Sequence, residues 1–325
     1  MTPLSSGKKI QLVRHGEFIP CKTAFIDTHT PGSDKKENFT IIGSGVSESS
    51  DQHVHIVETP GFNIGAAGQP PQCRNSLHSH HTAEVFIVLK GRWRFFWGRY
   101  GLAGEVVLEE GDIFNIPTGI FRGFENIGQS YGMLMAILGG DDSGGGVVWA
   151  PQVVEEARKH GLILAETGKL YDTQKGESLP EGIAPMSPLS NHELAQFGEP
   201  SAAQVVPYYV ARYWDMVALS NPFPSKVIGV NGMLKDKPGF EVDFFTHFTQ
   251  VKQYNNLHSE VFITTEGHWR VTCGNENQIL SPGDVALVSP HSQYQVEPSV
   301  SGEASLFRVK GTNDPAGPTW GYNSN

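Results

Sequence analysis

Short stretches in which hydrophobic and polar residues alternate, separated by glycine and proline, recur along the chain. Arg92–Trp97 alternates charged with bulky aromatic residues, and Glu84–Leu89 is rich in β-branched and aromatic residues. Runs of this kind predict β-strands, and their regular spacing, with turns between them, predicts a barrel or a sandwich. Pro151–His160 differs, because it begins with proline and carries its basic residues late. That order predicts a short helix.

The chain contains an internal repeat. The segment LHSHHTAEVFIVLKGRWR, which starts at Leu77, returns as LHSEVFITTEGHWR from Leu257. Downstream, the Gly-Asp turn at Gly111 returns at Gly283, in the same order and at a nearly constant offset. We therefore expect two copies of one β domain. The predicted organisation is an amino-terminal arm, a first barrel, a helix with a linker, and a second barrel, over residues 1–50, 51–150, 151–204 and 205–325.

Composition narrows the class of protein. The 325 residues carry a net charge of −10 and no basic run longer than a lysine pair, which argues against nucleic acid as a partner. The apolar runs have the length of strands and are too short to span a membrane. The three scattered cysteines indicate no disulfide framework, and the start of the chain has no apolar leader. These features predict a cytoplasmic protein without a membrane partner.

Two histidines and a glutamate give the strongest chemical signal. His78 and His80 are separated by one residue, so on a strand both imidazoles point to the same face. Glu84 follows at the head of the next predicted strand. Two imidazoles and a carboxylate suit one divalent transition metal, such as Fe, Mn, Ni or Zn. Three such ligands leave coordination positions open for a substrate or for dioxygen.

The wider string of residues resembles the cupin superfamily. The residues that carry the resemblance are His78, His80, Glu84 and Gly91 of a first motif and Gly111, Pro117, Thr118, Gly119 and Asn126 of a second. With the repeat included, the chain resembles a bicupin over roughly residues 55–150 and 205–320. This resemblance implies an all-β fold of two double-stranded β-helix barrels, of the jelly-roll type, with a short linker helix.

The resemblance also implies a function. Bicupins include dioxygenases, so the leading hypothesis is a metal-dependent, dioxygenase-type oxidoreductase that acts on a small anionic or aromatic substrate. The alternatives are a cupin that binds a sugar or an anion without turnover, and a cupin isomerase or lyase. Because cupins associate through barrel faces, the aromatic strand around Trp93 favours a homodimer.

One departure from the family pattern bears on the metal. Where metal-binding cupins supply a last histidine, this chain has Arg122, which has no lone pair to donate. Three outcomes stay open: His78, His80 and Glu84 hold the metal alone, His81 or another histidine completes the site, or no metal binds and Arg122 pairs with Glu84. A guanidinium inside a barrel also suits a substrate carboxylate or phosphate.

The second copy of the repeat has a degenerate motif. Four residues are missing from it, including the second histidine, and Tyr294 stands at the position of Arg122. His258, Glu260 and His291 remain as a second candidate metal set. The simpler interpretation is that the second barrel is structural and supports the first.

Overall fold

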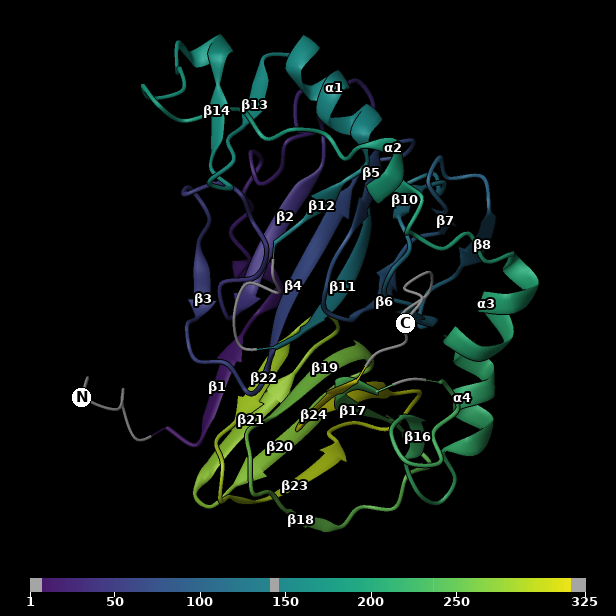
Figure 1. Cartoon of the computed structure of the whole chain (residues 1–325). Helices are drawn as coiled ribbons and strands as arrows, with labels where there is room; N and C mark the ends of the chain where they lie inside the picture. The colour runs from purple at the N-terminus through teal and green to yellow at the C-terminus, as the bar shows by residue number, and fades with distance from the viewer. Residues whose placement is uncertain (1–7, 141–145, 236, 317–325) are drawn as a thin grey trace.

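Two β-sandwich domains stack on each other in the computed structural model, which describes residues 8–140, 146–235 and 237–316. The first domain forms the upper part of Figure 1 and the second the lower part. Each half contains two sheets, which confirms the predicted all-β fold. The domain limits remain a prediction, and the outer ends of the predicted arm and second barrel, residues 1–7 and 317–325, lie outside the described residues.

The first domain is built from twelve strands. They are β2 (Glu37–Ile42), β3 (Val54–Ile56), β4 (Phe62–Gln69), β5 (Arg74–Ser79), β6 (Glu84–Lys90), β7 (Trp93–Trp97), β8 (Gly104–Leu108), β9 (Ile113–Ile116), β10 (Arg122–Asn126), β11 (Gly132–Gly139), β12 (Val148–Trp149) and β15 (Val210–Ala211). One sheet has the order β15-β9-β6-β11-β4-β2-β3 and the other the order β12-β5-β10-β7-β8. Strands β2 and β3 pair in parallel, whereas the neighbours on either side of β11 are antiparallel to it.

The second domain repeats this plan with fewer strands. They are β1 (Ile10–Val13), β16 (Ser225–Ile228), β17 (Lys237–Thr246), β18 (Gln253–Asn255), β19 (Glu260–Glu266), β20 (Trp269–Cys273), β21 (Glu276–Leu280), β22 (Val285–Val288), β23 (Gln293–Pro298) and β24 (Ser305–Ala316). Its sheets have the orders β1-β22-β19-β24-β17-β16 and β18-β23-β20-β21. Strand β19 lies between β22 and β24 as β6 lies between β9 and β11, which is the structural form of the repeat.

Helices occupy the connection between the domains. The predicted helix is confirmed as α1 (Pro151–Lys159), with the proline in its first turn. A hairpin of β13 (Leu162–Leu164) and β14 (Leu170–Asp172) follows, and then α2 (Asn191–Leu194), α3 (Ala202–Tyr209) and α4 (Tyr213–Leu219). The sequence did not predict α3 and α4, although Gln204 closes a capping box with Ser201 at the start of α3. None of the helices among the described residues is long and apolar enough to cross a bilayer.

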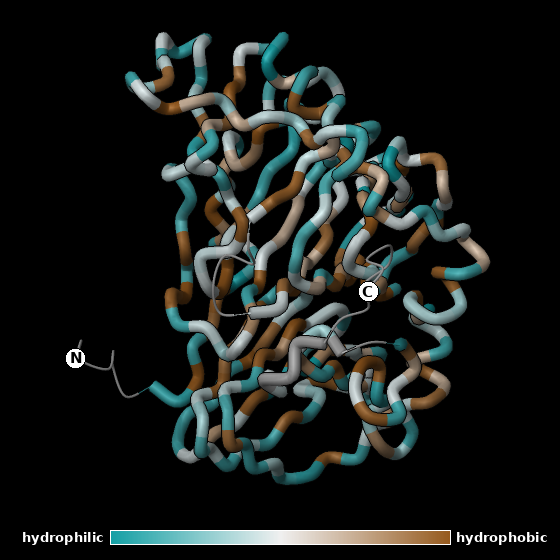
Figure 2. The backbone as a smooth tube through the Cα atoms, in the orientation of Figure 1, coloured by the Kyte–Doolittle hydropathy of each residue, from teal (hydrophilic) through white to brown (hydrophobic). Residues whose placement is uncertain are grey.

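The domains share a hydrophobic core. Val85 and Ile87 of β6 are fully buried in one cluster with Val261 and Ile263 of β19, from the matching strand of the other domain. Alternate residues of β6 point the other way, because side chains alternate across a strand. Phe86, for example, belongs to the interior of the first domain. Figure 2 shows hydrophobic residues along the strands of both domains.

The aromatic strand lies inside the first domain. Trp93, Phe95 and Trp97 of β7 are 0% exposed and pack with Phe86 and Phe124. These rings fill the sandwich rather than cover its surface, so they are not available to a second chain. The homodimer therefore stays a prediction, without the support that this strand was expected to give.

The two domains exchange edge strands. The segment before the first domain adds a strand to the second, and the segment before the second domain adds a strand to the first. Strand β1, near the start of the chain, pairs with β22 of the second domain, and β15, after the linker, pairs with β9 of the first. Arg14 follows β1 and lies 2.8 Å from Asp284, while Arg212 follows β15 and lies 2.7 Å from Asp112. Asp112 and Asp284 are the aspartates of the two Gly-Asp turns in the repeat. The exchange is reciprocal and ties the two domains together.

Candidate metal centre

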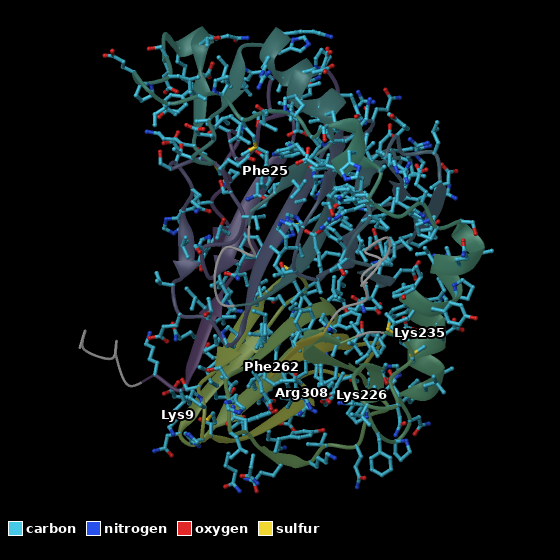
Figure 3. The ribbon with its side chains drawn as sticks, in the orientation of Figure 1. Lys9, Phe25, Lys226, Lys235, Phe262 and Arg308 are labelled. Carbon is cyan, nitrogen blue, oxygen red and sulfur yellow. The ribbon has the colours of Figure 1, made fainter. Side chains whose placement is uncertain are left out.

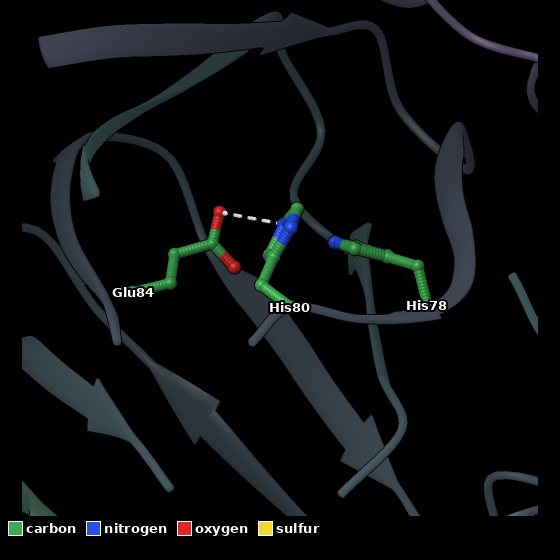
Figure 4. A group of neighbouring side chains, drawn as sticks. All are labelled: His78, His80 and Glu84. Carbon is green, nitrogen blue, oxygen red and sulfur yellow. Dashed lines mark ion pairs between the residues drawn. The ribbon is translucent and has the colours of Figure 1, made fainter. Parts of the chain in front are cut away.

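The structure brings His78, His80 and Glu84 together inside the first domain (Figure 4). His78 lies in β5 opposite Arg122 of β10, His80 follows the end of β5, and Glu84 is the first residue of β6. All three side chains are buried. Their nearest ligand atoms lie within 4.8 Å of one another, and His80 Nε2 lies 3.7 Å from a Glu84 oxygen. Among the described residues, this is the one group of three such side chains with that geometry.

Backbone carbonyls orient both imidazoles. Nδ1 of His78 lies 2.8 Å from the Ser76 carbonyl, and Nδ1 of His80 lies 3.0 Å from the Gly146 carbonyl. A carbonyl only accepts, so each Nδ1 carries the hydrogen and donates it. In a neutral ring the lone pair is then on Nε2, which is the arrangement that metal-binding histidines have.

Burial keeps these rings neutral. Desolvation lowers the pKa of His78 well below its usual value, and the nearby Arg122 guanidinium lowers it further. The same causes, in the same order, lower the pKa of His80 to about 4. Both imidazoles therefore offer a lone pair at neutral pH.

Arg122 is the direct partner of Glu84. Its Nε and Nη2 both donate to one oxygen of the carboxylate, Oε2, at 3.1 and 2.5 Å. The other oxygen, Oε1, faces His80. Arg122 is 2% exposed and is not among the residues that line the adjacent cavity. Two roles were considered for Arg122. In the structure its guanidinium pairs with Glu84, and binding of a substrate anion by Arg122 stays a prediction.

The donor set fits a divalent transition metal. Two ligands of one such ion, each about 2.1 Å from it, lie at most about 4.2 Å apart. The three ligand atoms lie within 4.8 Å of one another, so small side-chain rotations would bring them to a common ion. The ligands would be Nε2 of His78, Nε2 of His80 and Oε1 of Glu84. His81, considered as a further ligand, is exposed and does not belong to the group.

A cavity of about 60 Å³ adjoins the three residues. Its walls are largely apolar, with Phe86, Phe124 and Ala136 among the lining residues. Polar residues that sequence reasoning missed also line it, among them Lys36, Glu37, Gln69 and Asn75. Lys36 is buried and pairs with Asp27, and its Nζ donates to Asn75 at 2.7 Å. It belongs to the predicted arm, whose weak patterning gave no signal for a role at the site.

Trp149 forms another part of the cavity wall. Its ring centroid lies 5.5 Å from that of His78. Trp149 Nε1 donates to Glu48 at 2.6 Å, and the Ile26 backbone N–H donates to the other Glu48 oxygen at 2.8 Å. Burial raises the pKa of Glu48 to about 8, in spite of these two hydrogen bonds, which lower it.

We expect Glu48 to make stability depend on pH. The folded protein keeps the Glu48 proton up to about pH 8, whereas the unfolded chain releases it near pH 4.5. Stability from this group is thus complete below about pH 4.5 and falls, on the order of a few kcal/mol, as pH rises to 8. Urea unfolding of wild type and Glu48→Gln at pH 5, 6, 7 and 8 measures it. The unfolding free energy of Glu48→Gln should fall less with rising pH than that of the wild type. If both fell in parallel, Glu48 would not be the group responsible.

The second candidate metal set does not come together. His258 and His291 are exposed, whereas Glu260 is buried. Glu260, at the position of Glu84, accepts a hydrogen bond from the Tyr294 hydroxyl, and Tyr294 also accepts from Arg308 at 3.0 Å. The four residues lost from this copy removed the segment that carries His80 in the first domain.

An ion pair occupies the interior of the second domain instead. Arg308 Nη2 lies 2.6 Å from Asp243, and both residues are buried (Figure 3 labels Arg308). Strand register matches Arg308 with Ala136 and Asp243 with Gly65 of the first domain. The first domain thus has small residues where the second has a salt bridge, and its cavity lies beside them.

Comparison with known proteins agrees with this geometry. Residues 68–138 match the family model of the cupin domain, and residues 243–313 match that of the AraC-like ligand-binding domain. The chain therefore belongs to the cupin superfamily, with a cupin domain in each half, and is a bicupin. No curated protein matches it in sequence.

Solved structures with the same fold are distant in sequence. An oxalate decarboxylase from Lactobacillus farciminis is 11% identical, with a TM-score of 0.52 over 94% of this chain and 87% of that chain. Protein Ylba from E. coli is 9% identical, with a TM-score of 0.52 over 97% and 96%. A salicylate 1,2-dioxygenase from Pseudaminobacter salicylatoxidans is 15% identical, with a TM-score of 0.48 over 79% and 72%. At such identities the two matches with a TM-score of 0.52 show the fold alone.

Proposed function

We propose that this bicupin is a metal-dependent enzyme of the dioxygenase type that acts on a small, anionic substrate in its first domain. One observation supports the proposal: a ligand atom from each of His78, His80 and Glu84 lies within 4.8 Å of the other two, beside a cavity. Three protein ligands of this kind leave coordination positions open, as non-haem iron oxygenases require. The second domain would serve as support, since its described residues form no matching metal site and a buried ion pair fills the positions that match Ala136 and Gly65 of the first domain's cavity.

The residues of the chain would prepare the site for its metal. A divalent ion there supplies a Lewis acid that polarises a chelating substrate, or a redox centre for dioxygen. The Ser76 and Gly146 carbonyls hold the imidazoles in the ligating tautomer. Arg122 fixes Glu84 through Oε2 and leaves Oε1 directed at His80. Phe86, Phe124 and Trp149 line the cavity and would make the surroundings of the metal less polar than bulk water.

The cavity limits the size of the substrate. A cavity of roughly 150 Å³ holds a benzene ring, and this one measures about 60 Å³. Of the two substrate classes predicted from sequence, a short-chain acid fits the cavity better than an aromatic ring. Lys36 gives this cavity a buried cation, although Asp27 balances its charge.

Metal content and oxygen uptake test the proposal. We expect the purified protein, without added metal, to contain close to one equivalent of Fe, Mn, Ni or Zn, because three neutral or anionic ligands are already oriented. With a panel of short-chain keto and hydroxy acids, an oxygen electrode should record metal-dependent uptake that a chelator abolishes. If the protein converted one of these acids to a product without oxygen uptake, it would instead be an isomerase or a lyase.

A second candidate function rests on Arg122. Its two short hydrogen bonds to Glu84 already balance the buried carboxylate, as a metal otherwise would. In this alternative, the first domain binds a small molecule without a metal and without turnover. Protein that stays free of metal after dialysis against Mn²⁺ or Fe²⁺ would favour it over the enzyme.

A further inference from the structure

Ser76, whose carbonyl orients His78, lies at an irregular point of strand β5. Two residues of β5, Ser76 and Leu77, stand opposite one residue of β10, Gly123, and the regular pairing resumes at His78. Such a β-bulge takes its extra residue out of the ladder of hydrogen bonds and changes the direction of neighbouring side chains. The direction of the His78 ring therefore depends on what holds Ser76 in place.

Asp27 of the amino-terminal arm holds Ser76. Its Oδ2 accepts a hydrogen bond from the Ser76 backbone N–H at 3.0 Å. Asp27 is 0% exposed and lies in a turn, in which its carbonyl accepts from the Thr30 backbone N–H at 2.9 Å. The preceding residue, Ile26, is buried in one hydrophobic cluster with Leu77 of β5. The Asp27 carboxylate thus reaches Ser76 from a turn that is packed against the strand.

Lys36 balances the charge of Asp27 and orients Asn75. Its ammonium pairs with Oδ1 of Asp27, whereas the Ser76 N–H uses Oδ2. The same ammonium donates to Asn75 Oδ1 at 2.7 Å. Because an ammonium only donates, the amide oxygen of Asn75 faces Lys36, and the amide nitrogen Nδ2 lies 3.4 Å from His78 Nδ1. The arm therefore acts on both neighbours of this ring nitrogen, Ser76 and Asn75.

These two neighbours favour opposite tautomers of His78. The Ser76 carbonyl, at 2.8 Å, only accepts and so favours a hydrogen on Nδ1. The Asn75 amide nitrogen, at 3.4 Å, only donates and so favours a lone pair on Nδ1. A neutral imidazole carries one hydrogen and one lone pair, so the second tautomer places the hydrogen on Nε2, where it blocks a metal. The closer carbonyl favours the ligating tautomer as long as Ser76 stays in place.

We propose that Asp27 is a positioning residue for the metal centre: by holding Ser76, it keeps His78 in the tautomer that offers Nε2 to the metal. This inference rests on the proposed function, since the tautomer serves that function through metal binding. His80 takes no part in it, because the Gly146 carbonyl orients that ring from outside the arm.

Two double variants test the role of Asp27. Asp27→Asn with Lys36→Gln keeps an oxygen acceptor for the Ser76 N–H, whereas Asp27→Leu with Lys36→Gln removes it. Both variants lose the two charges together, so neither leaves a buried charge unpaired. In both, the new glutamine keeps an amide donor for Asn75. The asparagine variant is therefore the matched control for the leucine variant.

Nitrogen-15 NMR of metal-free protein with labelled histidine reports the tautomer of each ring, and His78→Ala and His80→Ala identify the two signals. We expect Nδ1 of His78 to carry the hydrogen in wild type and in the asparagine variant. In the leucine variant the hydrogen should move largely to Nε2, and Mn²⁺ affinity should be roughly 10–100-fold lower than in the control. His80 should keep its tautomer in all three proteins.

Three results would overturn the inference: a His78 tautomer that is the same in all three proteins, an equal change in both variants, or a change at His80 as well. If leucine disturbs folding, Asp27→Ala with Lys36→Gln removes the same acceptor with a smaller side chain. The metal content of wild type reports on the proposed function separately. Wild type that binds no metal refutes that function, while the tautomers, which are measured without metal, still decide whether Asp27 sets His78.

Discussion

His80→Ala is expected to remove the metal from the protein. The substitution deletes one of three ligands, and the two that remain form an incomplete site in which Arg122 already binds Glu84. We expect metal affinity to fall by at least about a hundredfold, since even partners outside the ligand set cost 10–100-fold when they are lost. Elemental analysis after dialysis against a defined Mn²⁺ buffer measures the effect, and oxygen uptake should disappear with the metal.

His81→Ala is the matched control for this experiment. His81 is the next residue in the chain but is exposed and outside the ligand group. The control should keep its metal and its activity. If His80→Ala retained both metal and activity, or if His81→Ala lost them, the assignment of the ligands would be wrong.

Asp243→Ala should strongly destabilise the protein. It removes the carboxylate that the buried Arg308 guanidinium hydrogen-bonds and leaves only Glu260, at 3.8 Å, as an acidic neighbour among the described residues. Breaking a buried pair on one side costs roughly 3–5 kcal/mol. Although burial raises the pKa of Asp243, Arg308, Lys310 and Lys226 outweigh it and lower that pKa to about 2. The pair is therefore charged at neutral pH, and its contribution is lost only below about pH 3.8, as pH falls toward 2. Urea unfolding monitored by fluorescence measures the loss.

Two further variants separate the ion pair from general damage. The double variant Asp243→Leu with Arg308→Met replaces the pair by apolar groups, so it should recover much of the lost stability. Glu297→Ala breaks the half-exposed pair with Arg270 and should cost less than about 1 kcal/mol. If Asp243→Ala cost no more stability than Glu297→Ala, the second domain would not depend on the pair between Asp243 and Arg308.

The fold was largely predictable because the repeat carries it. The match between the segments that start at Leu77 and Leu257 predicts two similar domains, and alternation along Arg92–Trp97 predicts a strand. The exchange of β1 and β15 was not predictable, since a strand of two to four residues pairs through its backbone. Nor did the sequence decide whether the face with Trp93, Phe95 and Trp97 lies inside the domain or at an interface between chains, because both environments bury bulky aromatic rings.

The candidate site was predictable only where spacing fixes geometry. His78, His80 and Glu84 lie on neighbouring strand ends, so their separation along the chain determines how they meet. The pairing of Arg122 with one oxygen of Glu84 depends on the register of β10 with β5, which the sequence left open. Lys36 reaches the cavity from the arm, and Glu48, also in the arm, accepts a hydrogen bond from Trp149 of the cavity wall. Both depend on contacts between residues far apart in the chain.

The proposed function requires one metal ion between two histidines and a glutamate of the first domain. Anomalous X-ray diffraction, recorded above and below the absorption edge of the metal found by elemental analysis, tests it most directly. We expect one strong peak within bonding distance of Nε2 of His78, Nε2 of His80 and Oε1 of Glu84. Crystals of metal-supplemented protein without a peak there, with Arg122 still bound to Glu84, would contradict it.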